Sequence, residues 1–337
     1  MTKLNLAVSR VLVTGGAGFI GSALVHALNG AGTERIVIAD ELGTSEKWKN
    51  LLPLRFADYL DKDDLLGALE SGKLGKFDLV LHMGACSSTT ENDASYLIRN
   101  NFEYTKALAV WALGEGTRFV YASSAATYGA GEQGMSDAEQ SPEALNRLRP
   151  LNMYGYSKHL FDLWAARQGV LEQITGLKYF NVFGPNEDHK GEMKSLVAKA
   201  VPQVMETGKL KLFRSYNPAY ADGEQERDFL YVKDATAMTL HLAASPSATG
   251  LFNIGSGQAA TWLQVADALF SALRRQKEIE FIEMPESLRG KYQYHTQADL
   301  SRLGRAGYER EPWPLDEAIR DYVQNYLARG ARLGDEV

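Results

Sequence analysis

The sequence predicts an α/β protein built on a doubly wound parallel sheet, with a smaller α/β substrate-binding domain interleaved with it. In the first half of the chain, short runs rich in β-branched residues alternate with amphipathic stretches long enough for helices. The runs are almost continuously apolar, as parallel strands covered on both faces should be. A glycine-rich turn joins the first run to the first amphipathic stretch. Strands alternating with crossover helices indicate a single parallel sheet of the Rossmann type.

The predicted strands come in a regular order. They are "RVLVTG" (10–15), "RIVIAD" (35–40), "FDLVLHMGA" (77–85), "RFVYASS" (118–124), "LKYFNVFG" (177–184) and "GLFNIGSG" (250–257). After Pro185 the pattern changes to longer helical stretches and a polar loop at 214–227. We therefore expect a dinucleotide-binding domain of residues 1–180, roughly 227–254 and part of the C-terminal third. The substrate-binding domain would take roughly 181–226 and part of 255–337.

Composition excludes several classes of protein. Of the 337 residues 45% are hydrophobic and 23% charged, which is typical of a soluble globular protein. The net charge of −6 argues against a nucleic-acid or anionic-membrane binder. The single cysteine, Cys86, excludes an internal disulfide and a Cys-built metal site, and no His, Asp or Glu spacing suggests a metal. No apolar run has the length of a membrane span or signal peptide, so we expect a cytoplasmic protein.

The first turn has the spacing of a dinucleotide site. "VTGGAGFIG" contains Gly15, Gly18 and Gly21 between the first strand and the first helix. Glycines there permit a tight turn, close backbone approach and a helix N-terminus that faces a pyrophosphate. Asp40, at the end of the second strand, is placed to bind the adenosine ribose hydroxyls. Because three independent features agree, we favour a nucleotide site over a simple glycine turn.

The charges near Asp40 leave the choice of nicotinamide cofactor open. Asp40 and Glu41 would repel a 2′-phosphate, which favours NAD. Lys47, Lys49 and Lys62 can offset that repulsion, although a single lysine of this kind is more often a solvated surface residue.

A redox pair is predicted on the helix after the fourth strand. "YGYSK" places Tyr154 and Lys158 four residues apart, on one face of a helix. The ammonium would lower the pKa of the phenol, and Lys158 can also hold a nicotinamide ribose. Ser124 ends the preceding strand and supplies a hydroxyl. Tyr156 is only two residues from Lys158 and off its face, so we prefer Tyr154.

With these motifs together, the chain resembles the extended short-chain dehydrogenases/reductases, the nucleotide-sugar epimerase and dehydratase group. Within it, the chain resembles the ADP-glyceromanno-heptose 6-epimerases over nearly its whole length. The similarity is carried by "TGGAGFIGS" (14–22), "GACSSTTE" (84–91), "YASSAATYG" (121–129), "LNMYGYSKHLFD" (151–162), "YFNVFGP" with "HKG" (179–191), "GEQERDF" (223–229) and "KYQYHTQADL" (291–300). "CSSTTE" and "HKG" are the most particular to the heptose enzymes.

The resemblance implies an isomerase. It would invert C6 of an ADP-bound heptose for the lipopolysaccharide inner core, by transient oxidation to a ketone and re-reduction with one tightly bound NADP per subunit. It would also form a homo-oligomer, by analogy a homopentamer. The resemblance and Lys47 favour NADP, the charges of Asp40 and Glu41 favour NAD, and we expect NADP.

The resemblance also implies roles for individual residues. Tyr154, Lys158, Ser124 and Lys190 would be catalytic. The cofactor would be lined by Gly15, Gly18, Phe19, Ile20, Gly21, Asp40, Glu41, Lys47, Lys62, Met83, Gly84, Ala85, Cys86, Ser87, Asn100, Lys158, Val182 and Lys190. The ADP-sugar would contact Asn181, Glu192, Lys199, Phe213, Arg214, Ser215, Tyr216, Arg227 and Tyr292.

Four of these positions depart from the family pattern. Glu41 and Met83 replace an Asn and a Glu usual beside the cofactor, and Glu192 and Lys199 stand where Ser and His are usual near the substrate. The departures affect cofactor preference and substrate contacts rather than the reaction class.

The turn "FNVFGPNEDHK" (180–190) carries a second proton-transferring group. It follows the fifth predicted strand, at the carboxyl edge of the sheet where ligands of such folds bind. An epimerase that returns hydride to the opposite face of a ketone needs an acid/base at a second place. Lys190 is our candidate, the alternative being a phosphate-binding or surface lysine. We read His189 as a loop or packing residue, and Cys86 as a small residue beside the cofactor, since no base accompanies it.

Two other functions compete with this one. A sugar-nucleotide C4-epimerase would share most motifs, whereas a dehydratase should carry an Asp-Glu pair where this chain has Ala125 and Ala126. A redox-silent NAD(P)-binding sensor would have lost Ser124, Tyr154 or Lys158, and all three are present.

Overall fold

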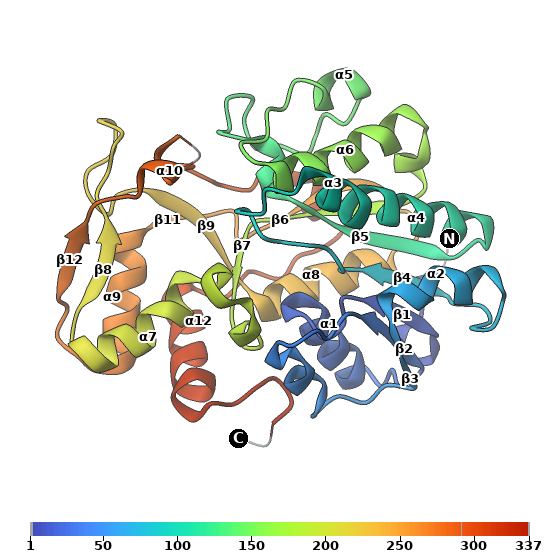
Figure 1. Cartoon of the computed structure of the whole chain (residues 1–337), viewed down its shortest axis with the longest axis horizontal. Helices are drawn as coiled ribbons and strands as arrows, with labels where there is room; N and C mark the ends of the chain where they lie inside the picture. Colours follow the sequence, from blue (N-terminus) through green and yellow to red (C-terminus); the bar gives the residue numbers. More distant parts are fainter. Residues whose placement is uncertain (1–2, 291, 336–337) are drawn as a thin grey trace.

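The computed structural model describes residues 3–290 and 292–335, so Lys291, the first residue of the 291–300 motif, lies outside the described residues. A seven-stranded parallel sheet forms the larger part of the molecule (Figure 1). Its order is β10-β6-β5-β4-β1-β2-β3. The strands are β1 (Val11–Thr14), β2 (Ile36–Asp40), β3 (Asp58–Asp61), β4 (Leu79–His82), β5 (Arg118–Ser124), β6 (Thr175–Tyr179) and β10 (Gly250–Ile254).

Helices cover both faces of this sheet. One face carries α2 (Lys62–Glu70), α4 (Tyr104–Gly114) and α6 (Met153–Arg167), and the other carries α1 (Phe19–Gly30) and α8 (Val232–Ala244) (Figure 1). Two hydrophobic clusters fill the two interfaces, one around Phe119 and Phe161, the other around Leu24 and Met238. The doubly wound parallel sheet predicted from the sequence is confirmed.

A smaller lobe follows the sixth strand in the chain. It contains the three-stranded sheet β11-β9-β7, with β7 (Asn181–Phe183), β9 (Glu226–Tyr231) and β11 (Ala259–Thr261), and the parallel pair β8 (Leu210–Phe213) and β12 (Ile279–Ile282). Packed against them are α7 (Leu196–Thr207), α9 (Trp262–Leu273) and α12 (Leu315–Asp321) (Figure 1). The remaining short α-helices are α3 (Ala94–Leu97), α5 (Pro142–Leu145), α10 (Glu286–Arg289) and α11 (Ser301–Arg305).

Among the described residues, the remaining helical segments are short 3₁₀ helices and two π-helical segments, η3 and η7. They are η1 (Leu6–Val8), η2 (Glu46–Leu51), η3 (Ile98–Glu103), η4 (Ala125–Tyr128), η5 (Val170–Glu172), η6 (Asp188–Met193), η7 (Tyr322–Tyr326) and η8 (Leu327–Arg329). No helix in the described part of the chain combines the length and hydropathy that a membrane crossing needs.

The single strand predicted at 177–184 is wrong. The chain leaves the large sheet after Tyr179, and the Phe180 amide donates to the Ile254 carbonyl at 2.9 Å. Asn181 then pairs with Phe229 in the smaller sheet. A continuous apolar run is compatible with either sheet, so its two halves join different ones. The edge strand β3 was not predicted, because its two end residues are exposed aspartates.

The start of α1 depends on two close backbone approaches. Gly15 has a positive φ of 68°, and a Cβ there would lie 2.6 Å from the Gly84 amide nitrogen. A Cβ on Gly21 would lie 2.0 Å from the Gly15 carbonyl oxygen. The helix therefore reaches the glycine turn only because both positions lack a side chain.

We expect Gly21→Ala to destabilise the fold by about 1–3 kcal/mol, because the added methyl group would clash with the backbone of Gly15. Thermal unfolding followed by circular dichroism measures the effect. Gly30→Ala, on the same helix with nothing within 4 Å of its Cβ, is the control and should be neutral or slightly stabilising. Equal melting temperatures for the two variants would contradict the packing argument.

Candidate active site

The glycine turn forms a cradle at the carboxyl end of β1. The Gly18 amide donates to the Gly15 carbonyl at 3.0 Å, and α1 begins at Phe19 without a side-chain cap. Unpaired N–H groups at a helix start attract anions. A backbone cradle that any Cβ would fill, at a helix N-terminus, fits the pyrophosphate of a dinucleotide.

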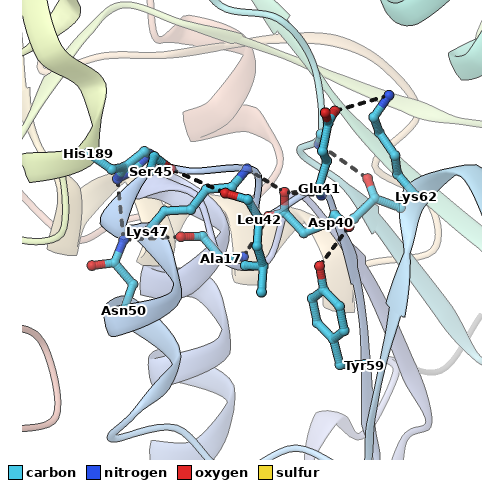
Figure 2. Close-up of polar contacts among 12 residues, drawn as sticks. Ala17, Asp40, Glu41, Leu42, Ser45, Lys47, Asn50, Tyr59, Lys62 and His189 are labelled. Atoms are coloured by element: carbon cyan, nitrogen blue, oxygen red, sulfur yellow. Dashed lines mark hydrogen bonds and ion pairs between the residues drawn. The ribbon is translucent and has the colours of Figure 1, made fainter.

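Asp40 is the centre of a polar cluster beside this cradle (Figure 2). One carboxylate oxygen accepts the Ala17 amide at 2.8 Å, and the other accepts the Glu41 amide at 2.7 Å. Lys47 donates to the same second oxygen at 2.7 Å. Asp40 is 6% exposed, so the ion pair is shielded from water.

The neighbouring carboxylate has its own cation. Lys62 lies 3.2 Å from Glu41 and 3.5 Å from the Asn100 side-chain oxygen. In Figure 2 the two acids lie next to each other, with Lys47 beside Asp40 on one side and Lys62 beside Glu41 on the other. The repulsion that these two acids would exert on a 2′-phosphate is therefore offset by cations already in place. Lys49 instead pairs with Glu46.

Two adjoining cavities lie along this sheet edge. The larger, of about 510 Å³, is lined by Gly15, Gly18, Phe19, Ile20, Gly21, Asp40, Lys47, Met83, Gly84, Ala85, Cys86, Ser87, Ser88, Ala122, Ser123, Ser124, Tyr154, Lys158, Tyr179, Phe180, Val182, His189, Lys190 and Met193. The smaller, of about 180 Å³, adds Thr14, Ala39, Glu41, Lys62, Tyr96, Asn100 and Tyr104. The structure thus brings every expected cofactor-lining residue to one continuous site.

The redox residues meet at one wall of the larger cavity. Ser124 ends β5, and Tyr154 and Lys158 occupy successive turns of α6, whose start is capped by Asn152. The Lys158 ammonium donates to the carbonyl oxygen of Ala122 at 2.8 Å. This bond joins the helix to the strand that carries Ser124.

Burial dominates the pKa of the phenol in this structure. Burial raises the pKa of Tyr154, and a hydrogen bond with Ser124 only partly opposes this. Burial also lowers the pKa of Lys158 to about 8. The Lys158 ammonium donates to a backbone carbonyl, and the hydrogen bond with Ser124 favours the phenolate.

Lys190 reaches the same cavity from the smaller lobe. Its ammonium lies 5.1 Å from the centroid of the Phe19 ring, and burial lowers its pKa. Glu187 fixes the turn by accepting the Ser195 hydroxyl at 2.7 Å and the Ser195 amide at 2.6 Å. Tyr154 and Lys190 are therefore two of the titratable groups that line this cavity, and they come from different elements.

His189 joins the Lys190 turn to the cofactor cradle. Its ring lies 3.4 Å from the Asn50 side-chain nitrogen, which also donates to the carbonyls of Ala17 and Asn186, each at 3.1 Å (Figure 2). Burial and the nearby charge of Lys47 lower the pKa of His189 to about 4, so the ring is neutral at pH 7. Cys86 is partly exposed and held by Asn101 through both backbone groups.

Some expected substrate residues gather at a separate cavity of the smaller lobe. This cavity, of about 380 Å³, is lined by Lys194, Leu196, Lys199, Ala200, Gln203, Leu210, Lys211, Leu212, Phe213, Trp262, Ile282 and Tyr292. Arg227 is 6% exposed, and its guanidinium lies 4.9 Å from the centroid of Tyr292 and 5.9 Å from that of Trp262. Aromatic rings beside a buried cation suit a base and a phosphate.

The other expected substrate residues line none of the three cavities. Glu192 is exposed and lies 3.5 Å from Lys199, which does line the third cavity. Arg214 pairs with Asp222 at 2.9 Å, and the Ser215 amide donates to the same carboxylate at 2.7 Å. Arg289 stacks on Tyr216 at 3.8 Å. The Asn181 side-chain oxygen accepts a 3.3 Å bond from Thr296. Six of the expected substrate residues therefore line none of these three cavities: Asn181, Glu192, Arg214, Ser215, Tyr216 and Arg227.

The sequence did not single out several cavity-lining residues. They are Thr14, Ser88, Ala39, Tyr96, Tyr104, Ala122, Ser123, Tyr179, Phe180 and Met193. Ala122 and Ser123 precede Ser124 on a strand that ends at the sheet edge, so their position is the signal that could have identified them.

Fold and site together define an α/β protein with a glycine-turn nucleotide cradle and with Ser124, Tyr154 and Lys158 gathered at the carboxyl edge of its parallel sheet. The chain belongs to the NAD dependent epimerase/dehydratase family, whose model matches residues 11–255. It is 50% identical to an ADP-L-glycero-D-manno-heptose-6-epimerase of Nitratidesulfovibrio vulgaris over 318 residues, 94% of this chain and 98% of the relative. It is 45% identical to one from Fusobacterium nucleatum, over 95% of this chain and 98% of that one.

Solved structures of sugar-nucleotide epimerases share the fold of this chain. The crystal structure of the Helicobacter pylori ADP-L-glycero-D-manno-heptose-6-epimerase has a TM-score of 0.79 at 26% identity, covering 96% of this chain and 98% of that chain. A Thermus thermophilus UDP-glucose 4-epimerase in complex with NAD has a TM-score of 0.74 at 26% identity, covering 96% and 99%.

Proposed function

We propose that this protein is an isomerase that inverts C6 of ADP-D-glycero-D-manno-heptose to give ADP-L-glycero-D-manno-heptose. The observation that carries the proposal is one cavity with two proton-carrying groups, Tyr154 on α6 and Lys190 on η6. The identity of 45–50% with heptose epimerases over nearly the whole chain supports the substrate. The product would supply the heptose of the lipopolysaccharide inner core.

The cofactor site would take a nicotinamide dinucleotide. The glycine turn and the α1 N-terminus would hold its pyrophosphate, and Asp40 with its neighbours would hold the adenosine end. When bound, the nicotinamide supplies reversible hydride transfer at the C6 carbinol carbon. Lys158 would hold the nicotinamide ribose, while Ser124 would donate to the reacting oxygen.

Inversion explains why two acid/base groups are useful. The oxygen of an inverted carbinol carbon must occupy two opposite orientations, so protons are exchanged at two places in the cavity. Tyr154, beside Ser124, would serve one orientation. Lys190, whose pKa is lowered by burial, would serve the other. A lysine with a lowered pKa gives up its proton more readily at neutral pH.

The nucleotide end of the substrate would bind in the smaller lobe. Phe213, Trp262 and Tyr292 offer apolar and aromatic walls for a base. Arg227 is the buried cation nearest these rings and suits a diphosphate. Lys199 and Glu192 form an ion pair at the edge of this cavity, and we infer that they adjust substrate contacts rather than the reaction.

A sugar-nucleotide C4-epimerase is the second candidate, since a UDP-glucose 4-epimerase shares the fold at a TM-score of 0.74. Incubation with ADP-D-glycero-D-manno-heptose, followed by NMR of the C6 configuration, tests the proposal. Run in deuterium oxide, a hydride-based inversion leaves C6 free of deuterium. Deuterium at C6 would indicate proton abstraction instead. Inversion at C4 of a UDP-hexose without heptose turnover would favour the second candidate.

We infer NADP as the cofactor, on the ion pairs Lys47–Asp40 and Lys62–Glu41. Each acid has a lysine partner, although Lys62 is shared with Asp63 at 3.3 Å, so a 2′-phosphate meets lysines as well as carboxylates. The NAD complex of a related 4-epimerase shows that the family site also accepts NAD. The dinucleotide domain would comprise residues 1–180, about 227–254 and part of the C-terminal third. We further expect a cytoplasmic homo-oligomer, by analogy a pentamer.

Glu41→Asn should raise the affinity for NADP relative to NAD by about two- to five-fold, because Lys62 loses a carboxylate partner and can face the phosphate. Calorimetric titration of cofactor-free protein with both dinucleotides measures the ratio. Glu103→Gln, which removes a surface ion pair with Lys106, is the control. An unchanged ratio in Glu41→Asn would mean that Glu41 faces away from the ribose.

Tyr154→Phe and Lys190→Met should each lower the epimerisation rate about 10²–10⁴-fold, as loss of a general acid/base does. Each should impair oxidation starting from a different C6 epimer, which single-turnover absorbance of the reduced nicotinamide resolves. Tyr156→Phe is the control, since Tyr156 is 45% exposed on the same helix. If Lys190→Met epimerises at a near-parental rate with only a raised KM, Lys190 is a binding residue and the two-base mechanism is wrong.

A further inference from the structure

A buried ion pair lies behind the redox wall of the larger cavity. Asp162 on α6 and Lys178 on β6 are 0% and 1% exposed, and their charged atoms are 3.6 Å apart. Removing two charges from water costs several kcal/mol per ion, so such a pair contributes little net stability and raises the question of its use. Nothing in the redox mechanism above employs it.

Asp162 connects the catalytic helix to the strand that carries Ser124. Its two oxygens accept hydrogen bonds from the Tyr121 hydroxyl at 2.8 Å and the Ser123 hydroxyl at 2.7 Å. Tyr121 and Ser123 lie on β5, and Ser123 directly precedes Ser124. Asp162 also follows Lys158 by four residues on α6, so the two side chains share a helix face.

Lys178 connects β6 to the turn that follows Ser124. Its ammonium donates to the Thr127 hydroxyl at 2.8 Å and lies 4.2 Å from the centroid of the Tyr128 ring. Thr127 in turn donates to the carbonyl oxygen of Ser124 at 2.8 Å. The cation therefore fixes η4, whose first turn is capped by Ser124.

We propose that the two residues are positioning residues with different tasks: the Asp162 carboxylate keeps the Lys158 ammonium charged, while Lys178 holds the Ser124 turn in place. The proposal rests on the function proposed above, in which the Lys158 ammonium holds the nicotinamide ribose. It extends the site to two residues that contact neither cofactor nor substrate.

The charges around Lys158 support the division of tasks. Burial lowers the pKa of Lys158 to about 8, and Asp162 is the larger of two groups that oppose this, Cys86 being the other. On β4, His82 faces Lys158 but is buried and neutral, its pKa lowered to about 3 by burial and by the lysine charge. Without Asp162, Lys158 would lose its proton at a lower pH.

The groups that face the buried pair itself are of both signs. On α6, His159 is neutral because burial lowers its pKa. Burial lowers the pKa of Lys178, and the charges of Asp162 and of Asp137, in the loop before α5, oppose this. Lys178 donates to Thr127 on η4, whereas Asp162 shares the α6 face with Lys158, so the two partners can be separated experimentally.

Three variants of the full-length, cofactor-loaded protein test the proposal. Asp162→Asn keeps the shape and one hydrogen-bond acceptor but removes the charge. Lys178→Met removes the cation and leaves Asp162 with its two hydroxyl donors. The double variant removes both charges together and avoids an unpaired buried ion, so it serves if Asp162→Asn does not fold.

Two readouts follow the charge of Lys158. The ¹³Cε chemical shift of Lys158, assigned with Lys158→Arg, gives its titration directly and needs no turnover. The pH dependence of kcat for heptose epimerisation gives the alkaline limb. In Asp162→Asn and in the double variant, both should move to lower pH by about one pH unit, because the supporting charge is lost. In Lys178→Met the titration should stay in place, while kcat falls to a similar extent at every pH.

The outcomes separate the proposal from its alternatives. If all three variants lower kcat equally with no change in the Lys158 titration, the pair is only structural and the proposal is overturned. If Lys178→Met moves the titration as far as Asp162→Asn does, the assigned division of tasks is also overturned. A protein that fails to epimerise ADP-heptose, yet shows the expected NMR shifts, would refute the proposed function and leave the Asp162–Lys158 coupling supported.

Discussion

The parallel direction of the seven strands is the constraint on which the whole site depends. Parallel strands need crossover connections, and their carboxyl ends therefore meet at one edge of the sheet. Residues far apart in the sequence become neighbours there without any long-range recognition beyond strand pairing. The strand-end residues that meet at this edge are Thr14 of β1, Asp40 of β2, His82 of β4, Ser124 of β5 and Tyr179 of β6.

The sequence was informative wherever a feature is local. The strands of the large sheet are buried on both faces, so apolar runs marked β1, β2, β4 and β5 closely. The glycine turn and the Tyr154–Lys158 spacing are also local, and both lie at the cavity. Sequence reasoning was less successful where pairing is non-local. The division of 177–184 between two sheets depends on β9 and β10, which follow much later in the chain.

Charge pairing was the part of the site that sequence alone could not supply. From charge alone, any of Lys47, Lys49 and Lys62 could offset the two carboxylates. Only the folded chain shows that Lys47 pairs with Asp40 and Lys62 with Glu41. Likewise, the direction of the Lys158 ammonium toward the Ala122 carbonyl depends on how α6 packs on β5. No sequence motif identifies Lys178, which lies within an apolar strand, and its partner Asp162 comes from another element.

The passage of the chain between the two sheets has a consequence for how this protein can vary. Only Phe180 separates the last residue of β6 from the first of β7. Side chains alternate along a strand, so one inserted residue here would turn every β7 side chain to the opposite face and carry the Lys190 turn out of phase with it. The number of residues at this junction is therefore constrained by the alternation of side chains along the strand, not by the room available for an extra residue. By contrast, residues 215–222 belong to no strand and line neither cavity at the sheet edge, so their number is not tied to strand alternation.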